Sequence, residues 1–78
     1  MDLIGGTVID VHDDATFDVK LSWEASGNER DYQSYERVHL ARPSLPTLAG
    51  DLRGKSVEIR VQKRDGYRRL IGMFSCVS

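Results

Sequence analysis

The sequence predicts an all-β fold, a small five-stranded barrel formed by a single domain over residues 1–78. Three observations carry this prediction. Apolar and polar residues alternate strictly in segments 15–23 and 56–63, which is typical of half-buried strands. Asp65-Gly66 is a strong hairpin signal before the last apolar segment. A chain of 78 residues that is 40% apolar and 29% charged has the composition of one globular domain.

The first two strands are expected to form a hairpin. Residues 7–11 are β-branched and apolar and follow two glycines, and segment 15–23 alternates. The short polar segment 12–14 between them predicts a tight connection. The apolar face of the second strand consists of Phe17, Val19, Leu21 and Trp23. This face is expected to lie in the core, with Trp23 in the core or at the barrel mouth.

The third strand is expected over about 32–41, after a polar loop at 24–31. Val38 and Leu40 point inward in this reading, and two prolines after residue 41 end the strand. Leucines then recur at helical spacing within 44–53. Because Gly50 weakens a helix there, only a short helical turn is predicted between the third and fourth strands.

The last two strands are expected at 56–63 and from 67 to about 76, with Val57, Ile59 and Val61 facing inward. Gly72 indicates a bulge or a close crossing of another strand. A three-stranded meander, a short helical connection and a final hairpin match the order of an OB-type barrel. An SH3-like barrel is the alternative, and the long connection before residue 56 favours the OB type.

Composition also limits the setting of the protein. The single cysteine, Cys76, excludes an internal disulfide framework and a multi-cysteine zinc site. No apolar run is long enough for a membrane helix, and the first residues do not have the pattern of a signal peptide. We therefore expect a cytoplasmic protein without membrane association.

Charge is distributed unevenly along a chain whose net charge is −1. The first 40 residues carry nine acidic and three basic side chains, and residues 41–78 carry three acidic and eight basic ones. Two interpretations are open: each half suits a different partner, or the halves neutralise each other when the strands interleave.

Four segments, taken in order, resemble a staphylococcal-nuclease-like domain. They are Thr7-Val8-Ile9-Asp10-Val11 with Thr16-Phe17-Asp18-Val19-Lys20-Leu21, then Arg37-Val38-His39-Leu40-Ala41, then Gly54-Lys55-Ser56-Val57-Glu58-Ile59, and finally Arg64-Asp65-Gly66-Tyr67-Arg68-Arg69-Leu70-Ile71-Gly72. The resemblance covers most of the chain through short, loose motifs, and it implies an OB-type barrel. The family continues into C-terminal helices, whereas this sequence ends after the fifth strand.

The resemblance also implies where catalysis would occur, and most of those positions are replaced. A calcium-binding Asp is Ala15 here, and a phosphate-contacting Arg is His39. A second calcium-binding Asp and the Glu that acts on the attacking water are Ser44 and Thr47. The phosphate-binding Arg of the last hairpin is kept as Arg69, and the glycine before it is Arg68. Because calcium needs several carboxylate oxygens, no phosphodiester hydrolysis and no enzyme activity are expected.

A second resemblance is to bacterial translation initiation factor one and S1-type RNA-binding domains. It rests on Gly6-Thr7-Val8, on Phe17, Val19 and Leu21 at the same spacing, on Gly54-Lys55-Ser56-Val57 and on the closing basic hairpin. Both resemblances imply the same barrel, so they agree on the fold.

A basic cluster on the last hairpin is the candidate contact surface for single-stranded DNA or RNA. Positive charge beside aromatic stacking platforms is what a single-strand site needs. Tyr67 would stack on a base, and Tyr32 and Tyr35 lie near the third strand. We predict a non-catalytic nucleic-acid-binding module with no cofactor and no metal. Its predicted contacts are Arg60, Lys63, Arg64, Tyr67, Arg68 and Arg69.

The acidic half supports a different class of function, a protein-interaction or inhibitor module that docks a basic partner protein. This hypothesis requires the acidic side chains to form one exposed patch, and it is disfavoured if they form ion pairs with arginines. The candidate residues are Asp13, Asp14, Asp18, Glu29, Asp31 and Glu36. A substitute metal site formed by Asp13, Asp14 and Asp18, or by His12 and His39, is a less favoured interpretation of these residues.

Overall fold

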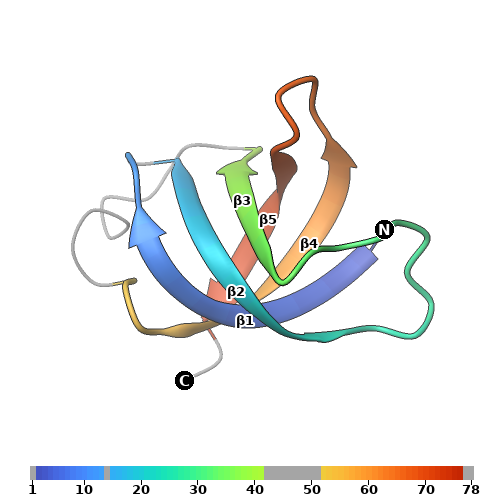
Figure 1. Ribbon diagram of the computed structural model, residues 1–78, viewed down its shortest axis with the longest axis horizontal. Helices are drawn as coiled ribbons and strands as arrows, with labels where there is room; N and C mark the ends of the chain where they lie inside the picture. Colours follow the sequence, from blue (N-terminus) through green and yellow to red (C-terminus); the bar gives the residue numbers. More distant parts are fainter. Residues whose placement is uncertain (1, 14, 42–51, 77–78) are drawn as a thin grey trace.

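A computed structural model describes residues 2–13, 15–41 and 52–76. The chain forms five strands: β1 (Asp2–Val11), β2 (Thr16–Glu24), β3 (Tyr35–Leu40), β4 (Ser56–Arg64) and β5 (Leu70–Cys76). They close into a barrel in the order β1-β2-β3-β5-β4, as Figure 1 shows. The predicted all-β, five-stranded barrel is therefore confirmed.

β1 closes the barrel because it is long enough to pair on both sides. It runs antiparallel to β2 from Ile4 to Val11 and antiparallel to β4 from Asp2 to Thr7. β3 and β5 are the only parallel pair among the described strands, from Val38 to Leu40 on β3. This pairing is short, and in Figure 1 the turn between β4 and β5 rises above it.

The core lies inside the barrel and follows the alternation of the sequence. The predicted inward residues Phe17, Val19, Val38 and Leu40 are buried, and so are Val57, Ile59 and Val61. Phe17 also meets Phe74 edge to face, with ring centroids 5.6 Å apart. Trp23 is 42% exposed and is the last residue but one of β2, so it lies outside the core.

Three strand starts differ from the prediction by three residues or more. β1 begins at Asp2 instead of residue 7, so Gly5 and Gly6 lie inside the strand and not before it. β3 begins at Tyr35 and β5 at Leu70, each three residues later than expected. The expected helical turn within 44–53 falls mostly on residues 42–51, outside the described part. No helix is found in the described ranges, and none is therefore long and apolar enough to cross a membrane.

Glycines allow the strands of the barrel to approach closely. A side chain at Gly5 would overlap the indole of Trp23, and one at Gly72 would overlap the backbone carbonyl of Arg60 on β4. The β4–β5 register shifts opposite Gly72, between Val61 and Lys63. The prediction that Gly72 marks a close crossing is confirmed.

A buried carboxylate ties the β2–β3 loop, residues 25–34, to the start of β1. Asp2 accepts hydrogen bonds from the amides of Glu29 and Arg30, each at 3.0 Å, and from the Tyr32 hydroxyl at 2.7 Å. The Glu29 amide and the Tyr32 hydroxyl together lower the pKa of Asp2 to about 2. Burial and the same carboxylate raise the pKa of Tyr32. The loop consequently runs beside the start of β1 (Figure 1).

Candidate functional site

An open cleft of about 980 Å³ lies on the outer surface of the barrel. Its walls come from three segments that are distant in sequence: the β2–β3 loop, the outer faces of β2 and β3, and the β4–β5 turn, residues 65–69, with the end of β4. The lining residues are Asp18, Asp31, Tyr32, Gln33, Tyr35, Glu36, Arg37, Arg64, Tyr67, Arg68 and Arg69. Four arginines and three carboxylates thus share one surface.

Four of the six predicted nucleic-acid contacts line this cleft: Arg64, Tyr67, Arg68 and Arg69. Arg60 and Lys63 are exposed on β4 but do not line it. The structure therefore divides the basic cluster into cleft residues and residues elsewhere on the barrel surface.

The β4–β5 turn is organised by Asp65. Its carboxylate accepts hydrogen bonds from the amides of Tyr67 at 2.9 Å and Arg69 at 2.8 Å, and from Arg69 Nε at 2.7 Å. Partial burial acts to raise the pKa of Asp65, but the hydrogen bonds outweigh it and the pKa is lowered. Arg68 lies within this turn with φ of 64°, a left-handed conformation that favours glycine.

The turn presents an aromatic ring and a cation to solvent. Tyr67 is 83% exposed, and the Arg69 guanidinium carbon lies 5.4 Å from its ring centroid. Arg69 is held there by its ion pair with Asp65. Arg68 is exposed, and among the described residues its side chain has no hydrogen bond or ion pair. Arg68 is consequently the turn's available cation.

Arg64 is committed to partners inside the protein. Its guanidinium donates to both carboxylate oxygens of Glu36, at 3.0 and 3.1 Å, and lies 6.0 Å from the ring centroid of Tyr32. Glu36 is only 6% exposed. The Glu36 carboxylate raises the pKa of Arg64. Arg64 therefore neutralises a buried charge.

The outer faces of β2 and β3 supply the second wall of the cleft. Arg37 donates from Nε to Asp18 at 2.9 Å, and Tyr35 is 57% exposed. Burial acts to raise the pKa of Asp18, but hydrogen bonds from Arg37 and His12 outweigh it and lower the pKa. From the sequence, Tyr35 is only an aromatic residue near the third strand, and Arg37 and Gln33 are not predicted as site residues. Arg37 and Gln33 gave no local signal, because only the folded barrel places them opposite the last hairpin.

The acidic residues of the alternative hypothesis do not form one exposed patch in the described residues. Glu36 is buried against Arg64, and Asp18 is shared by Arg37 and His12. Asp13 is exposed, and its carboxylate accepts the amide of Ala15 at 2.8 Å. Glu29 and Asp31 are exposed in the β2–β3 loop. The sixth candidate, Asp14, lies outside the described residues.

At the four positions that the nuclease-like resemblance predicts to be catalytic and that are replaced here, the sequence has no carboxylate. Ala15 is buried and lies directly before β2. His39 Nδ1 lies 2.8 Å from Thr16 Oγ1, its register partner across β2 and β3. Ser44 and Thr47 fall in the range that the structure does not describe.

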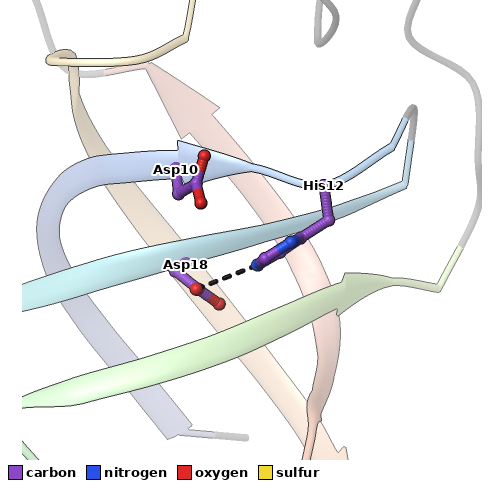
Figure 2. Close-up of side chains that lie close together, drawn as sticks. All are labelled: Asp10, His12 and Asp18. Carbon is purple, nitrogen blue, oxygen red and sulfur yellow. Dashed lines mark hydrogen bonds and ion pairs between the residues drawn. The ribbon is translucent and has the colours of Figure 1, made fainter.

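A group of potential metal ligands lies on the outer face of β1 and β2, where Figure 2 shows Asp10, His12 and Asp18 together. Their ligand atoms lie within 4.8 Å of one another, and His12 Nε2 is 2.9 Å from Asp18. This group differs from both sequence-based metal readings, since it includes Asp10 and not Asp13 or His39. Asp10 accepts Arg53 at 2.7 Å, and Asp18 accepts Arg37. Arginines already balance both carboxylates, so the geometry does not call for a cation.

Comparisons with protein-family models, with curated proteins and with solved structures gave no match.

Proposed function

We propose that the protein is a non-catalytic module that binds single-stranded nucleic acid in the cleft. The observation that carries the proposal is the gathering of two exposed tyrosines and exposed arginines on one open surface. Bases stack on exposed aromatic rings and phosphates are attracted to cations, which is how sequence-tolerant single-strand sites work. Tyr35 and Tyr67 would stack on bases, and Arg68 would contact phosphate.

The fold supports the proposal through the position of the cleft. The strand order and the parallel β3–β5 pair agree with an OB-type barrel. Barrels of that type bind oligonucleotides on the face of their second and third strands and on the loop between the fourth and fifth. The cleft contains these parts, and the β2–β3 loop adds a further wall. The nuclease-like and initiation-factor-like resemblances both remain predictions, as does a cytoplasmic location.

The absence of catalysis is part of the proposal. Hydrolysis of a phosphodiester by the nuclease-like route needs a cluster of calcium-binding carboxylates and a base near the water. By the nuclease-like resemblance, Ala15 and Ser44 stand at the two calcium-ligand positions and Thr47 stands at the position of the base. Docking of a basic protein is disfavoured, because Glu36 is buried and Asp18 is paired.

The test is fluorescence anisotropy of labelled single-stranded DNA and RNA, titrated with protein at several salt concentrations. We expect salt-sensitive binding at micromolar protein. Arg68→Ala should reduce the slope of log affinity against log salt by about 0.7, the value for one phosphate contact on a single strand. Tyr67→Ala should lower affinity by about 1–3 kcal/mol, the worth of one stacked base.

Arg60→Ala is the matched control, because it removes the same charge outside the cleft. Its salt slope should stay at the wild-type value. No binding at low salt, or equal effects of the Arg60 and Arg68 variants, would rule out the cleft as the site. If the protein binds, the ratio of RNA to DNA affinity distinguishes the two resemblances, because the initiation-factor-like resemblance implies a preference for RNA.

A further inference from the structure

Arg64 links three parts of the cleft through one guanidinium. Besides its paired bonds to Glu36 on β3, Nη2 donates to the backbone carbonyl of Asp31 in the β2–β3 loop at 3.3 Å. Nη1 donates to the backbone carbonyl of Arg68 in the β4–β5 turn at 3.0 Å. Four hydrogen bonds from one side chain therefore connect the loop, the strand and the turn.

Glu36 completes this connection from the other side. Its Oε2 also accepts the amide of Gln33 at 2.9 Å, so the loop is tied to the carboxylate as well as to the guanidinium. Breaking a buried ion pair by removing one partner leaves an uncompensated charge, which is costly. A phosphate that recruited Arg64 would have to draw it away from Glu36 and from both carbonyls.

We propose that Arg64 and Glu36 are positioning residues that shape the cleft before a ligand arrives, and that Arg64 is not a phosphate contact. This inference rests on the proposed function and refines it, because it divides the cleft arginines by role. Arg68 meets the ligand. Arg64 holds the carbonyl of Arg68 and so the left-handed turn that presents Arg68 and Tyr67.

Glu36→Gln separates the two roles because they predict opposite signs. If Arg64 positions the walls, losing the carboxylate lowers oligonucleotide affinity about tenfold, roughly the cost of ordering two long side chains on binding. If Arg64 contacts phosphate, the same variant frees it, raises affinity and steepens the salt slope by about 0.7. The second result overturns the proposal.

Asp31→Asn is the matched control for charge. It also removes one negative charge from the cleft, but only the backbone carbonyl of Asp31 bonds Arg64. We expect this variant to bind slightly more tightly than wild type, and Glu36→Gln more weakly. Equal gains in both variants would mean that charge alone governs binding, and the positioning role would be wrong.

Arg64→Lys keeps the charge and removes the planar fork, so it covers the case in which Glu36→Gln does not fold. Positioning predicts about tenfold weaker binding with an unchanged salt slope, whereas a lysine serves well as a phosphate contact and would preserve affinity. Amide hydrogen exchange at Asp65 and Arg68, whose bonds close the turn, should become faster than in wild type. This measurement needs no ligand. If wild type binds no oligonucleotide, the proposed function fails, and unchanged exchange would overturn the positioning role separately.

Discussion

Arg68→Gly should make the protein more stable, although it removes the residue we place at the ligand. Arg68 has φ of 64°, where the β-carbon of an L-residue costs roughly 1–2 kcal/mol. Glycine relieves that cost but loses about 0.5–1 kcal/mol more conformational freedom on folding. The two ranges leave a net gain of up to about 1.5 kcal/mol, or about 0.75 kcal/mol at their midpoints. For a domain of this size, the midpoint gain should raise the melting temperature by about 3–6 °C.

The assay is thermal and urea unfolding of wild type, Arg68→Gly and Arg68→Ala, followed by circular dichroism. Alanine removes the same guanidinium and keeps the β-carbon, so Arg68→Ala should show no such gain. Because the Arg68 side chain has no hydrogen bond or ion pair among the described residues, neither variant loses an internal contact there. A glycine variant no more stable than the alanine variant would show that the left-handed conformation carries no strain.

The combination of the two readouts bears on function. Strained residues persist where the surroundings hold them and where the strain serves a purpose. The hydrogen bonds of Asp65 and Arg64 hold this turn whatever residue stands at position 68. The nuclease-like pattern has glycine there. If Arg68→Gly gains stability and loses oligonucleotide affinity, the arginine is kept for binding and not for folding.

Two further predictions concern the barrel. The pKa of Asp2 is about 2, below its usual value, so its stabilising effect is complete above about pH 5 and is lost as pH falls through the folded-state pKa. Asp2→Asn should therefore be less stable than wild type at pH 7 and should lose less stability between pH 5 and pH 2. Acid unfolding monitored by circular dichroism measures both effects. Parallel curves of stability against pH for the two proteins would contradict this prediction. Gly72→Ala places a methyl group against the Arg60 carbonyl, so urea unfolding should show a loss of about 1–3 kcal/mol, and an unchanged midpoint would refute the close approach.

The inward faces of the strands could be read from the sequence because alternation with period two is a local signal. Val57, Ile59 and Val61 are buried as that signal requires. The start of β1 could not be read in the same way. Gly5 and Gly6 have the composition of a turn, and only the approach of neighbouring strands shows why they lie within a strand. The burial of the Asp2 carboxylate could not be predicted either, because its hydrogen-bond donors lie in the β2–β3 loop, distant in sequence.

The candidate site shows the corresponding limit for charge. A run of arginines predicts a positive surface. The positive potential that remains depends on which arginines form ion pairs with carboxylates, and those carboxylates are distant in sequence. Arg64 meets Glu36 and Arg53 meets Asp10, so bases of the second half neutralise acids of the first. The uneven charge of the sequence is thus partly internal pairing. The positive charge that the cleft offers to a ligand comes from arginines without a carboxylate partner. Arg68, on its left-handed turn, therefore carries more of the proposed recognition than the number of basic residues in the sequence suggests.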